Sequence, residues 1–301
     1  MFLLAASAAG EEREIRLASK PADLIGTLLR PVGGGKVPGV LILGGSGPTD
    51  RDGNQPGMYN DSLKLVAHGL AGCGIASLRP DKRGVAASHA AGAFEEDINF
   101  DDYVTDAVRW ARLLAAQPGI GRIELMGHSE GALFATLAAQ QVAPEKLVLL
   151  EGAGRPAGAV LREQLAGAAL SPGLRRRAFE AVGKLERGES VEEVPPALGL
   201  LFRPSVQAYL IAWFAHDPVA ELARTTVPAL VVQGGTDLQI PPADGRRLAA
   251  ARSNIELAAF GGMNHVLRAA PEDWSENLAT YRQRDLPLMP GVVERLCRFL
   301  K

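Results

Sequence analysis

The chain has 301 residues and a formal net charge of −2; 47% of its residues are hydrophobic and 22% are charged. A chain of this length and composition folds around a sizeable core, which excludes a disordered protein. The balanced charge excludes a general nucleic-acid binder, and no apolar run in the sequence reaches the about 20 residues that a transmembrane helix needs.

The chain starts with the apolar stretch MFLLAASAAG, residues 1–10. This stretch has no basic residue and is short for a secretory signal. Two interpretations are open: a loosely held start in a cytoplasmic protein, which we take first, or the rest of a trimmed export signal. In both cases we expect a soluble protein, and the sequence leaves open whether it is a monomer or a homodimer.

Strands and helices are expected to alternate along most of the chain. Residues 12–30 predict an antiparallel strand pair, because EREIRLAS and DLIGTLLR are short, partly alternating segments separated by KPA. Apolar runs predict further strands at 40–45, 74–80, 123–127, 146–152, 228–235 and 255–262, with helical patterns at 61–70, 97–117, 130–141 and 243–251. This order indicates an α/β fold with a mostly parallel central sheet and helices on both faces.

The alternation stops between Gly152 and Thr226, where helical patterns follow one another without a clear strand. A segment of this length is expected to be either functional or an insertion with structure of its own. We therefore predict a core formed by residues 1–151 and 226–301. The helical cap, residues 152–225, is expected to be inserted between two late strands.

The sequence MGHSEG places Ser129 in a G-x-S-x-G pattern at the end of an expected strand. The pattern alone is weak in a chain with 34 glycines. Here, however, it follows a buried strand and opens a segment rich in helix formers, which is the context of a nucleophilic serine on a sharp strand-to-helix turn. We therefore expect Ser129 to be a catalytic nucleophile.

A serine nucleophile needs a base, and the base needs an orienting acid. Asp237 follows the strand expected at 228–235, and His265 follows the strand expected at 255–262. Their order after Ser129, and their position at carboxyl ends of strands, predict a Ser129–His265–Asp237 triad. Glu151, at the end of an earlier strand, is the competing acid.

The tetrahedral intermediate of acyl transfer requires hydrogen-bond donors for its oxyanion. The backbone N–H of Glu130, directly after the nucleophile, is one expected donor. The second is expected in the glycine-rich loop LGGSGPTDRDGN, residues 43–54, where we favour the N–H of Ser46. Asp50 and its neighbours in this loop resemble part of a calcium-binding loop, but the glycine and the bidentate glutamate of such loops are missing. We expect these charged residues to brace the loop instead.

No metal or cofactor is expected from the sequence. The five histidines have no metal-ligand spacing, and the chain has no CxxC pair. Cys73 and Cys297 lie in apolar surroundings, so we expect two buried free thiols, with a disulfide between them as the alternative.

These motifs together resemble the α/β-hydrolase superfamily, most closely its serine-aminopeptidase-like and dienelactone-hydrolase-like bacterial branches. The resemblance lies in LILGGSGPTDRDGN, SLRPDKRGVAAS, MGHSEG, LFRPSVQAYLIAWF, VVQGGTDLQIP and GGMNHVL, which extend from Val40 to Leu267. It implies the same triad and an oxyanion hole from Ser46 and Glu130. Many relatives start the oxyanion loop with His-Gly, whereas this chain has Gly44 and Gly45.

The sequence thus predicts a cofactor-independent carboxylesterase that acts on small to medium uncharged esters through an acyl-enzyme. Two alternatives stay open: a peptidase or amidase of the same fold, and a non-catalytic binding protein that retains the fold. The expected substrate contacts lie on the cap at Phe202, Tyr209, Trp213 and Phe214, although each of these could instead pack the cap against the core.

Overall fold

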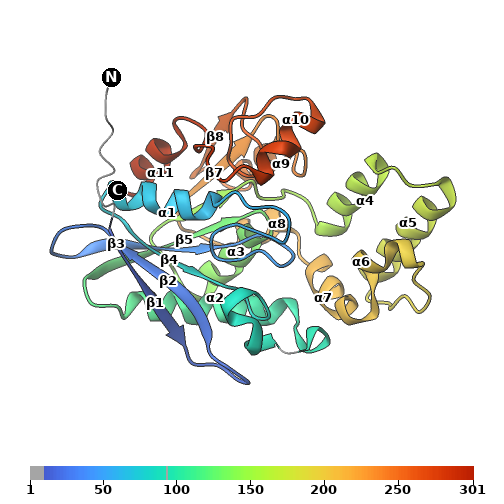
Figure 1. The fold of residues 1–301 in the computed structure, drawn as a ribbon, viewed down its shortest axis with the longest axis horizontal. Helices are drawn as coiled ribbons and strands as arrows, with labels where there is room; N and C mark the ends of the chain where they lie inside the picture. Colours follow the sequence, from blue (N-terminus) through green and yellow to red (C-terminus); the bar gives the residue numbers. More distant parts are fainter. Residues whose placement is uncertain (1–9, 93) are drawn as a thin grey trace.

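A computed structural model describes residues 10–92 and 94–301 and shows a central sheet flanked by helices (Figure 1). The apolar start at residues 1–9, on which the question of compartment rests, lies outside the described residues. The strands of the sheet are β1 (Glu11–Leu17), β2 (Leu24–Arg30), β3 (Val37–Leu43), β4 (Ala76–Pro80), β5 (Ile120–His128), β6 (Leu147–Leu150), β7 (Ala229–Gly234) and β8 (Ile255–Phe260).

The sheet has the strand order β1-β2-β4-β3-β5-β6-β7-β8. β1 pairs antiparallel with β2, and β2 pairs antiparallel with β4. All further neighbours, from the β4–β3 pair to the β7–β8 pair, run parallel. The expected antiparallel pair and the expected parallel sheet are therefore confirmed.

The central strands are buried on both faces, which explains their continuous apolar runs. In β3, Leu41 and Leu43 face one hydrophobic cluster, while Val40 and Ile42 face the other. The first cluster is covered by α2 (Phe100–Ala115), α3 (Glu130–Val142), α8 (Pro218–Ala223) and α9 (Pro242–Ala249), and the second by α1 (Ser62–Gly72) and α11 (Val292–Leu300).

Helix α2 illustrates how local sequence sets an element. Asn99 accepts a hydrogen bond at its N-terminus and Asp102 closes a capping box, which satisfies backbone N–H groups that the helix leaves unpaired. Its buried face includes Phe100, Val104 and Trp110. This face packs against the sheet and against α3, the helix that follows Ser129.

Between β6 and β7 the chain forms α4 (Ala157–Gly167), α5 (Pro172–Glu186), α6 (Gly199–Phe202), α7 (Pro204–Phe214) and α8. Helices α4 to α7 extend to one side of the sheet (Figure 1) and share a hydrophobic cluster of their own. Helix α8 instead buries Leu222 in the cluster of the sheet. The division into a core and a cap at residues 152–225 stays a prediction.

The remaining described elements are short: η1 (Ala86–Gly92), η2 (Glu95–Asp97), η3 (Pro196–Leu198), α10 (Trp274–Ala279) and η4 (Thr280–Arg282). None of the described helices is by itself long and apolar enough to cross a membrane. Only α7 together with the preceding Pro196–Phe202 segment, bent by 50° at the break, meets those criteria by length and composition.

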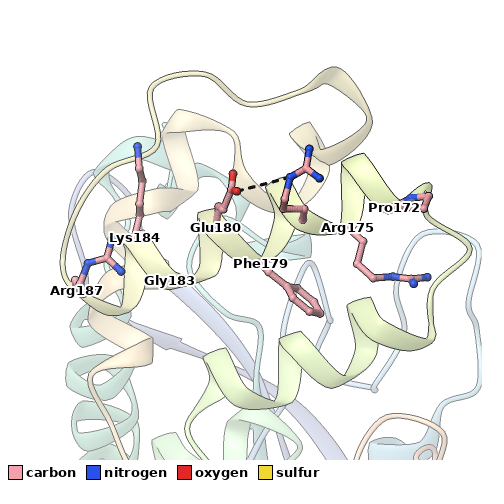
Figure 2. Close-up of a pocket in the computed structure, with 8 residues that line it drawn as sticks. Pro172, Arg175, Phe179, Glu180, Gly183, Lys184 and Arg187 are labelled. Atoms are coloured by element: carbon pink, nitrogen blue, oxygen red, sulfur yellow. Dashed lines mark ion pairs between the residues drawn. The ribbon is translucent and has the colours of Figure 1, made fainter.

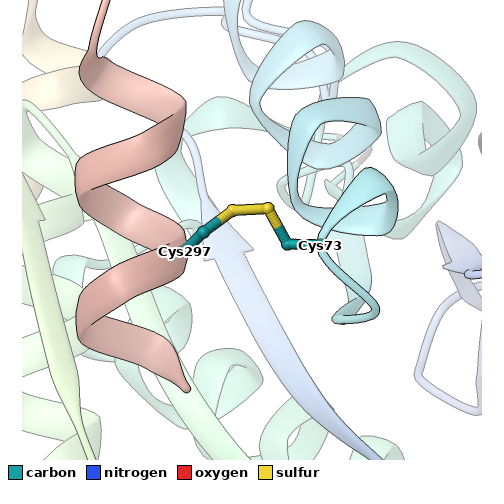
Figure 3. The surroundings of a disulfide bond; sticks show 2 residues. All are labelled: Cys73 and Cys297. Atoms are coloured by element: carbon teal, nitrogen blue, oxygen red, sulfur yellow. A yellow bond between two sulfur atoms is a disulfide. The ribbon is translucent and has the colours of Figure 1, made fainter.

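The two cysteines form a disulfide, so the expectation of two free thiols is wrong (Figure 3). Cys73 ends α1 and Cys297 lies in α11, and their Cα atoms are 6.1 Å apart. The helices approach closely, because a Cβ added to Gly69 would lie 2.7 Å from a Val293 methyl carbon. Because the two cysteines are 224 positions apart in the chain, the sequence does not reveal that they lie close together.

Candidate active site

Ser129 occupies a strained turn between β5 and α3, with φ 55° and ψ −123°. A non-glycine residue at positive φ is uncommon and is often found at functional sites. The two flanking glycines allow the turn to close. A Cβ on Gly127 would lie 1.9 Å from the Gly131 carbonyl oxygen, and one on Gly131 would lie 2.4 Å from the Leu43 carbonyl oxygen.

His265 and Asp237 form a direct hydrogen bond. His265 Nδ1 lies 2.8 Å from Asp237 Oδ2, and both side chains are almost completely buried. The other carboxylate oxygen, Oδ1, accepts hydrogen bonds from the backbone N–H groups of Gln239 and Ile240 at 2.7 and 3.0 Å. Burial alone would raise the pKa of Asp237, but the charge and hydrogen bond of His265 hold that pKa below its ordinary value.

The three expected triad residues follow β5, β7 and β8, at the carboxyl edge of the sheet where sites of open α/β folds are built. The Ser129 N–H donates to the Leu150 carbonyl at 2.8 Å, which ties the turn to β6. In the described part of the chain, the Ser129 hydroxyl and His265 share no hydrogen bond. Such bonds are often long before a substrate binds and shorten in the reacting complex.

His128 contacts the backbone of the loop that carries His265. Its Nε2–H donates to the His265 backbone carbonyl at 2.7 Å, and the two rings lie 4.8 Å apart between centroids. Burial, together with the positive charge of His265, lowers the pKa of His128 to about 4. His128 is therefore a neutral donor at neutral pH and not a second base.

Glu151, the competing acid of the sequence, lies beside Asp237 and is fully buried. Its Oε2 accepts hydrogen bonds from Gln233 Nε2 at 2.6 Å and from the Gly234 N–H at 3.0 Å. Burial and the charge of Asp237 raise the pKa of Glu151 well above its usual value. The raised pKa of Glu151 favours its neutral form, and Asp237 is the carboxylate that contacts His265.

The loop after β3 reaches the nucleophile at Gly45. A Cβ on Gly45 would lie 3.1 Å from Ser129 Cβ, so a side chain at this position would press on the serine. The next residue, Ser46, has a backbone N–H without an acceptor among the described residues. The N–H of Glu130 is also unpaired by the helix, because it belongs to the first turn of α3. The two expected oxyanion donors are therefore both free.

Charged residues brace this loop, as expected. Arg51 binds Asp81 through its backbone N–H at 2.8 Å and through its guanidinium at 2.6 Å. Asp50 Oδ1 accepts the N–H groups of Asp52 and Asn54. Within residues 10–92 and 94–301, no group of three or more His, Cys, Asp or Glu side chains is arranged to hold a metal ion.

The four expected cap contacts lie in two different environments. Phe202 and Phe214 are 0% and 7% exposed and belong to the cap's own hydrophobic cluster. Tyr209 and Trp213 are only partly buried and pack against Phe100 of α2. The Tyr209 hydroxyl donates to Glu130 Oε1 at 2.6 Å, so Tyr209 is the cap residue that reaches the nucleophile turn.

A surface groove lies elsewhere, on the exposed side of cap helix α5 (Figure 2). Its volume is 740 Å³, and an ion pair of 3.9 Å between Arg176 and Glu180 spans part of it. The groove is lined by Pro172, Arg175, Arg176, Phe179, Glu180, Gly183, Lys184 and Arg187. Because none of the expected triad residues lines it, we read it as a solvated helix face.

Lys82 is a residue near the site to which the sequence assigned no role. It follows β4 within the quoted stretch SLRPDKRGVAAS, and its ammonium contacts the loop that carries Ser46. Neither periodicity nor motif spacing predicts this contact. Lys82 follows β4 and the loop follows β3, and the two come together because these strands pair in the sheet. The hydrogen bond from His128 to the His265 carbonyl is likewise predicted by neither pattern.

Comparisons with known proteins show the family and the fold of the chain. The model of the Alpha/beta hydrolase family matches residues 39–277. The esterase EstD of Thermotoga maritima is 27% identical over 266 residues, which cover 85% of this chain and 60% of EstD. The chain therefore spans less than two thirds of the length of this curated relative.

Solved structures show the same fold at lower identity. Est1E from Butyrivibrio proteoclasticus matches with a TM-score of 0.62 and 18% identity, covering 95% of this chain and 97% of Est1E. A hyperthermophilic esterase from the archaeon Pyrobaculum calidifontis matches with a TM-score of 0.57 and 17% identity, covering 97% of this chain and 85% of that enzyme. Both likenesses concern the fold alone.

Proposed function

This chain belongs to the alpha/beta hydrolase family, and on that premise we propose that it is a carboxylic ester hydrolase that needs no cofactor. Ser129 is the proposed nucleophile, His265 the base and Asp237 the acid that orients it. The observation that carries the proposal is the convergence of a strained serine turn, a buried His265–Asp237 pair and two free backbone N–H groups.

The proposed reaction has two halves. His265 Nε2 accepts the Ser129 proton while Oγ attacks the ester carbonyl carbon, and the N–H groups of Ser46 and Glu130 stabilise the negative oxygen. The alcohol then leaves with the proton held by His265, which forms an acyl-enzyme. Water, deprotonated by His265, attacks this ester, and the acid leaves as the serine regains its proton. Asp237 stabilises the imidazolium in both halves.

The proposed substrates are small to medium uncharged esters. Tyr209 and Trp213 of α7, Phe100 of α2 and Phe134 of α3 form a connected aromatic cluster next to the nucleophile turn. Phe100 and Phe134 are buried, so Tyr209 and Trp213 form the accessible part of this cluster, and their rings favour apolar acyl or alcohol groups over charged ones. Glu163, an acidic cap residue that a peptidase could use to bind an amino terminus, is already paired with Arg155 at 2.6 Å.

The proposal is tested by hydrolysis of p-nitrophenyl esters from acetyl to long acyl chains. We expect Ser129→Ala to reduce kcat by roughly 10⁴-fold or more, because the acyl-enzyme cannot form. Ser253→Ala, which removes an exposed serine, serves as the matched control and should retain full turnover.

Three results would contradict the proposal. Turnover that survives in Ser129→Ala would exclude this serine as the nucleophile. An absence of turnover on every ester, with hydrolysis of aminoacyl anilides instead, would favour the peptidase alternative, whereas inactivity on both would favour a binding protein.

A further inference from the structure

The ammonium group of Lys82 lies directly against the loop that carries Ser46. The side chain is only 10% exposed. Its Nζ donates to the carbonyl oxygens of Gly45 at 2.5 Å and Gly47 at 2.7 Å. A charged donor to two carbonyls fixes the orientation of both peptide groups more strongly than a neutral donor would.

The first of these peptides also contains the Ser46 N–H. In a planar trans peptide the C=O and N–H bonds point in opposite directions, so a Gly45 carbonyl bound by Lys82 turns the Ser46 N–H away from Lys82. The Ser46 carbonyl is held separately, because it accepts hydrogen bonds from the Thr49 hydroxyl at 2.6 Å and from Gln55 Nε2 at 3.0 Å. The peptide groups on both sides of Ser46 are therefore fixed.

The Cα of Gly45 lies against Ser129, as the 3.1 Å separation of an added Cβ from the serine Cβ shows. The Ser46 N–H thus belongs to the peptide group that follows Gly45, the residue next to the nucleophile. This N–H has no acceptor among the described residues. We propose that Lys82 is a positioning residue that holds the Ser46 N–H toward the oxyanion; this inference rests on the ester hydrolysis proposed above.

The carboxyl group of Glu130 lies next to the Lys82 ammonium. Glu130 Oε2 lies 4.0 Å from Lys82 Nζ, and Oε1 accepts the Tyr209 hydroxyl at 2.6 Å. The Tyr103 ring adds a cation–π contact, with its centroid 5.5 Å from Nζ. Burial lowers the pKa of Lys82, and the negative charge of Glu130 counteracts this.

Glu130 also carries the other proposed donor in its backbone. One buried pair therefore links both donors: the side chain of Glu130 contacts Lys82, and Lys82 fixes the peptide of Ser46. Tyr209 of the cap joins these contacts through the hydrogen bond of its hydroxyl to Glu130. The structure thus connects helix α7 to both sides of the proposed oxyanion hole.

The test is Lys82→Met, which retains most of the aliphatic stem and removes the three donors. With p-nitrophenyl butyrate we expect kcat to fall about 10- to 100-fold while KM changes less than about threefold, since the lost interaction acts on the transition state. Affinity for a trifluoromethyl ketone, which forms a tetrahedral oxyanion with a serine, should fall by a similar factor.

Lys146→Met is the matched control. Lys146 likewise donates to a backbone carbonyl, that of Phe299, at 2.5 Å, and its Nζ lies 5.5 Å from the Phe299 ring centroid. It lies at the amino end of β6, away from the site. We expect this variant to lose stability at most, with kcat unchanged.

The outcomes separate the two proposals. If Ser129→Ala abolishes turnover and Lys82→Met retains kcat within twofold, the role of Lys82 is overturned and the esterase proposal stands. If Ser129→Ala remains active, the esterase proposal itself is wrong. If Lys82→Met fails to fold, Glu130→Gln is measured instead. A fall in kcat of about three- to tenfold at constant KM supports the positioning role of Lys82, and an unchanged kcat overturns it.

Discussion

Two carboxyl groups, those of Asp237 and Glu151, lie side by side behind His265, and their pKa values are shifted in opposite directions. His265 and the backbone N–H of Ile240 hold the pKa of Asp237 below its ordinary value, whereas burial and the charge of Asp237 raise the pKa of Glu151. Two neighbouring carboxylates cannot both ionise at low cost in a buried site. A protonated Glu151 can donate to Asp237, so the imidazole faces a single negative charge of fixed position.

This arrangement predicts how stability depends on pH. Because the pKa of Glu151 is higher in the folded chain than its ordinary value of 4.5, folding takes up a proton above that pH. The free energy of unfolding therefore falls as pH rises from 4.5 toward the folded pKa, by at most about 1.4 kcal/mol per pH unit. Glu151→Gln removes this decline, because the amide oxygen can still accept the hydrogen bonds of Gln233 and Gly234 and the amide does not titrate.

The measurement is urea unfolding of the wild type and Glu151→Gln between about pH 5 and pH 8. We expect the stability difference to shift in favour of the variant as pH rises. Glu272→Gln, at an exposed carboxyl, should follow the wild type throughout. Parallel pH curves for the wild type and Glu151→Gln would mean that Glu151 is ionised in the folded protein.

At the scale of elements, the turn from β5 to α3 depends on backbone contact between strand and helix. Gly127→Ala would bring a Cβ to 1.9 Å from the Gly131 carbonyl oxygen, and the obstructing atom is backbone that no side-chain movement can relieve. We expect a loss of about 3 kcal/mol or more in the free energy of unfolding and a loss of ester hydrolysis.

A glycine in the same strand provides the control for this substitution. The nearest atom to a Cβ on Gly121 is Lys36 Cβ at 3.3 Å, and Gly121 is exposed. Gly121→Ala should therefore change stability by no more than about 1 kcal/mol and retain activity. Equal urea midpoints for the two variants would show that the turn tolerates a side chain.

At the scale of the whole molecule, the sequence predicted what depends on local pattern. Alternating apolar runs and helical segments indicated the parallel sheet, and the order of Ser129, Asp237 and His265 indicated which loops would meet. Contacts between distant segments were not predictable, because no local pattern records them. The donation of Lys82 to Gly45 and the burial of Phe202 inside the cap cluster are of this kind.

The Cys73–Cys297 bond is the longest-range contact that the sequence left open. It joins the end of α1, just before β4, to α11, and so lies near the amino edge of the sheet, opposite the proposed triad. In chain-entropy terms, a bond between cysteines separated by 224 positions restricts the unfolded chain by about 5.4 kcal/mol.

We expect the double variant Cys73→Ala/Cys297→Ala to lose about 2–5 kcal/mol in the free energy of unfolding. Its kcat should equal that of the wild type at temperatures where both are folded, because the site lies at the other edge of the sheet. Dithiothreitol should lower the wild-type urea midpoint toward that of the variant and leave the variant unchanged. Titration of two free thiols in the denatured, non-reduced wild type, with a midpoint insensitive to reductant, would instead show that α1 and α11 are held by packing alone.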